Sequence, residues 1–243
     1  MGRDRLIADS DRNGPVSAII PAAGRGLRFG GSVPKQFLTL GNTPLLFHTI
    51  KPFLALPEIG EIIIVVPEKQ IVELDSLLQP IDLERKIRLI AGGERRQDSV
   101  QNGLAAVAPE CELVVIHDAG RPFVTEKMIR DCIAARGNNA GAIMALPASD
   151  TVKRVVPGSR VIAETIPRET IWLAQTPQVF RKSILLEALV AAEREGISGT
   201  DEAALVERLG YQVVIVNGSP RNFKITTPDD WETARRIWEA END

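Results

Sequence analysis

The chain has 243 residues, of which 44% are hydrophobic, and this is enough apolar content for the core of one large α/β domain or of two small ones. A formal net charge of −3 argues against broad binding of nucleic acid or of anionic membranes, so any recognition of anions should be local. No apolar run approaches about 18 residues, and a transmembrane helix is therefore not expected.

The N-terminal segment and the two cysteines indicate where the protein works. Residues 1–14 mix both signs of charge and lack the apolar stretch of a secretory signal, so we expect a disordered tail there. Cys111 and Cys132 lie in or beside apolar segments, without the paired spacing of a metal or redox site. We expect buried thiols in a reducing compartment, and hence a cytoplasmic protein.

Short apolar runs of strand length alternate with helical patterns through the first 146 residues. The predicted strands are residues 17–21, 62–66, 87–90, 113–116 and 142–146, and the predicted helices are residues 44–54, 69–78, 97–107 and 125–136, the last beginning at Thr125 and stopping at Gly137. Nearly continuous apolar strands indicate that both faces of the sheet are covered. The pattern predicts an α/β fold with a doubly wound, mostly parallel, Rossmann-like sheet and helices on both faces.

After residue 146 the alternation stops and a hairpin is predicted. Residues 150–156 and 161–166 read as two strands around a turn at Pro157 and Gly158. An isolated two-stranded ribbon is marginally stable in water, so we expect this projecting arm, about residues 148–170, to pack on a second subunit of a homodimer.

The rest of the chain returns to the same domain. It is predicted to pass through residues 172–180, helices at 183–195 and 202–209, a strand at 212–216 and a closing helix at 228–240. No segment has the composition of a linker between domains, so residues 15–243 are predicted to form one domain that carries the arm.

A loop rich in glycine and basic residues, PAAGRGLRFGGSVPK at residues 21–35, follows the first predicted strand. Its glycines allow a close backbone approach to an anion, and the carboxyl end of a strand is where open α/β sheets place their ligands. The loop has no GK pair, as GxxxxGK[ST] requires, and Phe29 stands where the third glycine of GxGxxG would be. It is therefore a different kind of phosphate-binding loop or a plain surface loop.

Two further polar clusters follow predicted strands. In HDAGRP, Asp118 is placed to hold a divalent metal and Arg121 to reach a phosphate, although a helix cap and a surface ion pair would look the same. We interpret His117 as a hydrogen-bonded structural residue. In AGGERRQDSV, Gly93 permits close contact with a planar ligand and Ser99 offers a hydroxyl, although a simple turn before a helix would also fit.

Seven motifs in register along the chain carry a family resemblance. They are PAAGRGLRFGGSVPKQF, HDAGRPF, DTVKRV, IPRETIW, QTPQVF, GTDEAALVE and NFKITTPDD. From about residue 16 to residue 238 the chain resembles the 2-C-methyl-D-erythritol 4-phosphate cytidylyltransferase family of the non-mevalonate isoprenoid pathway. The resemblance implies a nucleotidyltransferase that converts CTP and 2-C-methyl-D-erythritol 4-phosphate (MEP) to 4-diphosphocytidyl-2-C-methyl-D-erythritol and pyrophosphate, with Mg²⁺ as cofactor.

The same resemblance implies roles for individual residues. Arg28 and Lys35 would be the catalytic cations, and Asp118 would help to hold Mg²⁺. The residues implied for CTP are Ala22, Ala23, Gly24, Gly26, Gly93, Glu94 and Ser99. Those implied for MEP are Arg121, Thr151, Arg168, Thr176, Thr200 and Lys224. Because Thr151 and Arg168 lie on or beside the arm, the resemblance implies that they reach the site of a neighbouring subunit.

Two departures from the family pattern and three alternatives remain open. Gly120 stands where the family often has alanine, and Glu94 stands where aspartate is common. Ribitol 5-phosphate cytidylyltransferases share HDAxRP and PKQ but usually have LAGG where this chain has PAAG. A catalytically silent nucleotide-binding protein would not be expected to keep Arg28, Lys35 and Asp118 together. A fusion with the next pathway enzyme is not expected, since no further domain follows Asp243.

Overall fold

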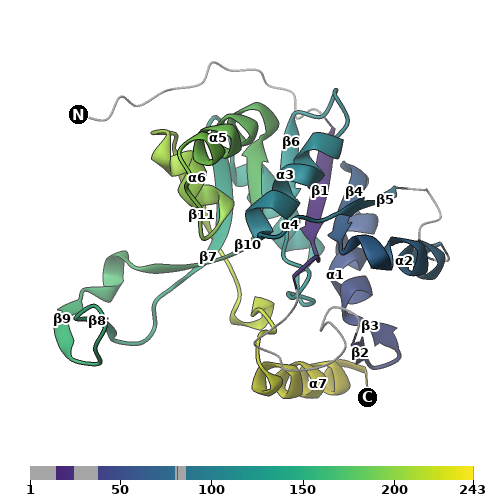
Figure 1. The fold of residues 1–243 in the computed structure, drawn as a ribbon. Helices are drawn as coiled ribbons and strands as arrows, with labels where there is room; N and C mark the ends of the chain where they lie inside the picture. The colour runs from purple at the N-terminus through teal and green to yellow at the C-terminus, as the bar shows by residue number, and fades with distance from the viewer. Residues whose placement is uncertain (1–14, 25–37, 80, 82–85, 243) are drawn as a thin grey trace.

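A seven-stranded sheet forms the centre of the protein, with the strand order β11-β7-β10-β6-β1-β4-β5 (Figure 1). The computed structural model describes residues 15–24, 38–79, 81 and 86–242. The predicted tail at residues 1–14 lies outside these ranges, as do Gly26, Arg28 and Lys35 of the glycine-rich loop. The strands of the sheet are β1 (Val16–Pro21), β4 (Ile59–Val66), β5 (Ile87–Ala91), β6 (Leu113–Ile116), β7 (Gly141–Pro147), β10 (Trp172–Arg181) and β11 (Val213–Asn217).

The sheet is parallel except at β10. Strand β1 pairs in parallel with both β4 and β6, so that Ile19 lies opposite Ile63 and Ile116. Strand β10 runs antiparallel to its two neighbours, β6 and β7. The mostly parallel sheet confirms the predicted fold class. The antiparallel insertion was not predicted, because an apolar strand has the same sequence pattern in either direction.

Helices cover both faces of the sheet. They are α1 (Leu45–Leu54), α2 (Ile71–Leu78), α3 (Arg96–Ala106), α4 (Glu126–Ala135), α5 (Lys182–Arg194), α6 (Glu202–Arg208) and α7 (Pro228–Asn242). In β1, Ala18 and Ile20 belong to one core with side chains of α1, α2 and α4, while Ile19 belongs to a second core with α3, α5 and α6. Alternate residues of a fully buried strand thus serve two cores, which explains its continuous apolar sequence.

Local signals set several of the element ends. The Thr125 hydroxyl caps α4 by accepting a hydrogen bond from the backbone N–H of Met128 at 3.2 Å, and Gly137 follows the helix with φ of 47°. Both features confirm the prediction. The helix predicted at 69–78 begins instead as a short 3₁₀ turn, η2 (Glu68–Gln70). Cys111 and Cys132 are both buried as predicted, and burial raises the pKa of the Cys132 thiol to about 12.

The predicted hairpin is present and projects from the sheet (Figure 1). Strands β8 (Val152–Val155) and β9 (Ile162–Ile166) pair antiparallel, and Gly158 takes a φ of 77° in the turn between them. The arm exposes apolar side chains, including Val156 and Val161. Its role in a dimer stays a prediction, as does the assignment of residues 15–243 to one domain.

A third, smaller core attaches the C-terminal helix beside a second hairpin, which was not predicted. This hairpin is formed by β2 (Thr39–Leu40) and β3 (Thr43–Pro44). Leu40, Leu45, Ile225 and Ala234 are buried together there, with Trp238 packed against them. The segment that leads into α7 passes close to the loop after β6, since the Ile225 backbone N–H donates to the Gly120 carbonyl oxygen at 2.9 Å. In the described part of the chain, no helix is long and apolar enough to span a bilayer.

Gly141 gives a test of sheet packing. A Cβ atom at this position would lie 2.4 Å from Phe180 Cδ1 and 2.7 Å from the Val179 carbonyl oxygen, both in the neighbouring strand β10. We expect Gly141→Ala to lower the free energy of unfolding by about 1–3 kcal/mol in urea denaturation. Gly60→Ala is the matched control, because its added Cβ would meet only the Val16 carbonyl oxygen, at 4.0 Å. Equal stability of the two variants would contradict this account of the packing.

Candidate functional site

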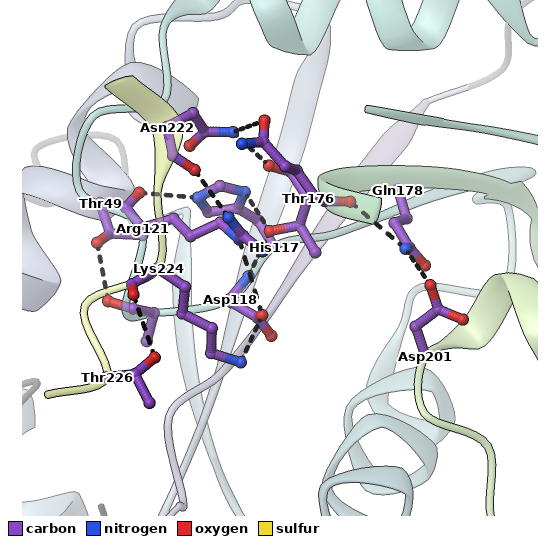
Figure 2. A network of polar contacts seen from close by, with 12 residues as sticks. Thr49, His117, Asp118, Arg121, Thr176, Gln178, Asp201, Asn222, Lys224 and Thr226 are labelled. Carbon is purple, nitrogen blue, oxygen red and sulfur yellow. Dashed lines mark hydrogen bonds and ion pairs between the residues drawn. The ribbon is translucent and has the colours of Figure 1, made fainter. Parts of the chain in front are cut away.

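The site is built where β6 ends and β10 passes it. Gln178 of β10 lies opposite Ile116, the last residue of β6. Because β10 runs the other way, the residues before Gln178 continue beyond β6 and bring Thr176 beside Asp118. The Asp118 backbone N–H donates to Thr176 Oγ1 at 3.0 Å (Figure 2). The antiparallel strand thus places one of its own side chains at the carboxyl end of β6. In a fully parallel sheet, only loop residues would lie there.

His117 is a structural residue of this site. Its side chain is fully buried, with Nε2 at 3.1 Å from the Arg121 carbonyl oxygen and Nδ1 at 3.0 Å from Thr176 Oγ1. A carbonyl oxygen can only accept, so Nε2 carries the proton and Nδ1 accepts from the threonine hydroxyl. Burial lowers the pKa of His117 to about 4, so the ring is neutral at physiological pH. This agrees with the structural interpretation made from the sequence.

The Asp118 carboxylate is buried among three cations. Its Oδ1 atom lies 3.1 Å from Arg96 Nε, and its Oδ2 atom lies 2.7 Å from Lys224 Nζ and 4.0 Å from Arg121 Nε. Burial alone would raise the pKa of Asp118, but Arg96 and Lys224 hold it well below its usual range. The carboxylate is therefore ionised whenever these cations are in place.

Arg96 also binds a second buried carboxylate. Its Nη1 and Nη2 atoms donate to the two carboxylate oxygens of Glu202, at 2.7 and 2.9 Å. Burial raises the pKa of Glu202, and the Arg96 guanidinium opposes this shift. Neither residue has a role that could be predicted from the sequence, because no local pattern pairs side chains that are 106 positions apart. The group comprises three cations and two carboxylates, which gives a net charge of +1 at the end of β6.

Arg121 and Lys224 are held in place by the segment before α7. Arg121 Nη1 donates to the Asn222 carbonyl oxygen at 2.7 Å, and Asn222 Nδ2 donates to the Thr176 carbonyl oxygen at 2.8 Å (Figure 2). The backbone N–H of Ile225, next to Lys224, donates to the Gly120 carbonyl oxygen at 2.9 Å. The structure therefore brings together four of the predicted site residues: Asp118, Arg121, Thr176 and Lys224.

The loops after β1 and β5 meet beside this group. A Cβ atom at Gly92 would lie 2.3 Å from Ala23 Cβ and 3.0 Å from Ser99 Oγ, so a glycine is needed for this close approach. The Ser99 hydroxyl accepts from the Gly93 backbone N–H at 3.2 Å and donates to the Arg95 carbonyl oxygen at 3.2 Å. Glu94 is exposed. The described candidate nucleotide residues, which include Ala22 and Gly24, thus lie on two loops in contact.

The other three described residues predicted for MEP have exposed side chains. Thr200 is exposed just before α6, next to Asp201, whose carboxylate accepts from Gln178 Nε2 at 2.8 Å (Figure 2). Thr151 and Arg168 are exposed on the arm, where Arg168 Nη1 donates to the Ser149 carbonyl oxygen at 2.5 Å. The hairpin of β8 and β9 extends away from the sheet (Figure 1).

The described residues contain no group of three or more histidine, cysteine, aspartate or glutamate side chains that could hold a metal ion. Asp118 offers one carboxylate, with both oxygens in ion pairs. This donor suits Mg²⁺, which is commonly bound through one or two carboxylates together with substrate phosphates.

Comparisons with known proteins give a consistent result. The model of the 2-C-methyl-D-erythritol 4-phosphate cytidylyltransferase family matches residues 16–240. A protein of that name from Syntrophus aciditrophicus is 47% identical over 216 residues, which are 88% of this chain and 92% of the relative. Another, from Solibacter usitatus, is 43% identical over 229 residues, covering 90% of this chain and 93% of the relative.

Two solved structures have the same fold. The crystal structure of 4-diphosphocytidyl-2C-methyl-D-erythritol synthase from Anaerococcus prevotii is 31% identical, with a TM-score of 0.83 and coverage of 93% of this chain and 96% of that one. The 2-C-methyl-D-erythritol 4-phosphate cytidylyltransferase from Thermus thermophilus is 32% identical, with a TM-score of 0.74 and coverage of 93% and 99%.

The Thr176 hydroxyl provides a test of how the site is held. In Thr176→Val, the buried Asp118 N–H and His117 Nδ1 lose the oxygen that both of them contact. We expect the free energy of unfolding in urea to fall by about 1–3 kcal/mol, because buried polar groups are left unpaired. Thr176→Ser keeps the hydroxyl and should retain most of the stability. A valine variant as stable as the wild type would contradict this role.

Proposed function

The chain belongs to the 2-C-methyl-D-erythritol 4-phosphate cytidylyltransferase family, and we propose that it transfers a cytidylyl group from CTP to MEP in the non-mevalonate isoprenoid pathway. The products are 4-diphosphocytidyl-2-C-methyl-D-erythritol and pyrophosphate. The observation that carries this proposal is the family match over residues 16–240. The cationic group at the carboxyl end of β6 supports it, because the reaction brings two phosphorylated substrates together.

The chemistry is chiefly a problem of charge. An oxygen of the MEP phosphate forms a bond to the α-phosphorus of CTP, and the bond to the β-phosphate breaks with its electrons leaving on pyrophosphate. The attacking phosphate is already ionised, so no strong base is needed. A neutral, hydrogen-bonded His117 is compatible with this mechanism. The main requirement is that preorganised cations and backbone N–H groups meet the charge that develops at phosphorus.

The proposed CTP site consists of the loops after β1 and β5. Backbone groups of Ala22, Ala23, Gly24 and Gly26 would contact the triphosphate, and Arg28 and Lys35 would stabilise the charge at the α-phosphate and on the leaving pyrophosphate. Gly93, Glu94 and Ser99 would read the cytosine. A close backbone edge can exclude uracil, because the wrong base would leave buried polar groups unpaired.

The proposed MEP site combines two subunits. Arg121, Thr176, Thr200 and Lys224 would come from one chain, and Thr151 and Arg168 from the arm of its partner. Exposed apolar side chains on the arm, such as Val156 and Val161, support a homodimer, because a two-stranded ribbon needs a surface on which to bury them. In such a dimer neither active site would be complete without the other chain.

Mg²⁺ is the proposed cofactor. Asp118 would hold it together with phosphate oxygens of CTP, and the metal would neutralise part of the phosphate charge. Lys224, which contacts the same carboxylate in the structure, would bind the MEP phosphate. A cytoplasmic location also stays a proposal, and it rests on the two buried free cysteines.

The proposed activity predicts pyrophosphate release when the purified protein is given CTP, MEP and Mg²⁺. Release should stop with excess EDTA and return when Mg²⁺ is added back. UTP in place of CTP and ribitol 5-phosphate in place of MEP serve as matched controls. Turnover with ribitol 5-phosphate but not with MEP would show the alternative polyol phosphate activity, and the absence of turnover with MEP would refute the proposal.

The proposed contribution of the arm predicts a substrate-specific kinetic effect. Arg168→Ala should raise KM for MEP by about tenfold or more, the size expected for a lost charge-assisted hydrogen bond, and leave KM for CTP unchanged. Arg160→Ala removes the same charge from the turn of the arm and should resemble the wild type. A rise in KM for CTP instead of MEP would show that Arg168 is wrongly assigned.

A further inference from the structure

We propose that Arg96 is a positioning residue, which holds the Asp118 carboxylate in its working orientation, and that Glu202 anchors Arg96 for this purpose. The inference rests on the proposed function, because it concerns how the cations of the MEP site are kept available. Neither residue would contact a substrate in the proposed site. Both would act through Asp118.

The geometry around Arg96 is that of a bridge between two carboxylates. Nε lies 3.1 Å from Asp118 Oδ1, while Nη1 and Nη2 bind the two oxygens of Glu202 at 2.7 and 2.9 Å. The side chain of Glu202 is 2% exposed and that of Asp118 is 10% exposed. A planar guanidinium bound at two points by a buried carboxylate has a fixed plane, so the direction of its remaining Nε–H is fixed as well.

The bridge joins three segments that carry proposed substrate contacts. Arg96 is the first residue of α3 and lies three positions after Gly93; Glu202 is the first residue of α6 and lies two positions after Thr200. The next residue, Gln97, strengthens the connection, because its side chain accepts from the Gly199 N–H at 3.1 Å and donates to the Ile197 carbonyl oxygen at 3.3 Å. The start of α3 is thus tied to the segment before α6.

Arg96 also determines how strongly Asp118 interacts with the other two cations. One carboxylate oxygen is held by Arg96, and the other faces Lys224 at 2.7 Å and Arg121 at 4.0 Å. Without Arg96, both oxygens of Asp118 would be free to pair with Lys224 and Arg121. These are the two cations proposed for the MEP phosphate, and they would then be less available to it. Loss of the bridge should therefore weaken the binding of MEP more than that of CTP.

The choice of variant matters, since Arg96→Ala alone would leave the Glu202 carboxylate buried without a partner and would strongly destabilise the fold. The double variant Arg96→Met/Glu202→Gln removes both charges and keeps similar volumes. The matched control is Arg130→Met/Glu58→Gln. That pair has the same residue types, with Arg130 Nε 2.7 Å from Glu58 Oε1, but it is more exposed and joins α4 to the residue before β4, beside the start of a parallel strand instead of the end of one.

We expect Arg96→Met/Glu202→Gln to raise KM for MEP by about tenfold or more, the effect of losing one hydrogen bond to a charged group, with KM for CTP unchanged. The control pair should keep both wild-type KM values. Arg96→Lys should give a smaller rise, because a lysine keeps the charge beside Glu202 but cannot bind both carboxylates in a fixed plane. Thermal unfolding of each variant shows whether the measured enzyme is folded.

Three results would overturn the inference: wild-type KM values in the double variant, an equal rise in both KM values, or a fall in kcat alone. If the double variant does not fold, Arg96→Lys provides the test instead. An unchanged KM for MEP in Arg96→Lys would then overturn the inference. A wild-type protein that does not convert CTP and MEP would instead refute the proposed function, so the two failures are distinguishable.

Discussion

The buried charge of Asp118 is the constraint on which the candidate site depends. A carboxylate removed from water costs several kcal/mol unless cations and hydrogen bonds compensate for it. The compensating groups come from distant parts of the chain: Arg96 from the start of α3, Arg121 from the same loop and Lys224 from the segment before α7. The site therefore forms only when the helices around the end of β6 and the C-terminal segment are all in place, and this makes its geometry a property of the whole fold.

The cations around Asp118 also outnumber the carboxylates that they contact. His117 is neutral because it is buried, and Thr176 uses its hydroxyl to connect the imidazole to the Asp118 backbone. What remains is an excess of positive charge in surroundings of low dielectric, where an arriving phosphate interacts more strongly than it would in water. Rigid dipoles and fixed ion pairs suit phosphoryl transfer, since little reorganisation is then needed as charge develops.

Much of the fold could be predicted from local sequence. The apolar runs identified β1, β4, β5, β6 and β7 because burial on both faces leaves a local signature, and Thr125 and Gly137 marked the ends of α4 because caps act over a few residues. The direction of β10 and the hairpin of β2 and β3 depend on pairing across the fold, and they were not predicted. The family resemblance named Asp118, Arg121, Thr176 and Lys224, but only the structure showed that they meet. The family resemblance did not identify the bridge between Arg96 and Glu202, because the two residues lie in different segments and no local pattern connects them.

The contact between Gly92 and Ala23 also constrains how this protein can change through evolution. A side chain at position 92 would have no room beside the Ala23 methyl group, because its Cβ atom would lie 2.3 Å from that of Ala23. A substitution of Gly92 is therefore tolerated only when Ala23 or the loop itself changes with it. The two positions should therefore covary among relatives. The sizes of the two residues should reflect how closely the two loops are packed.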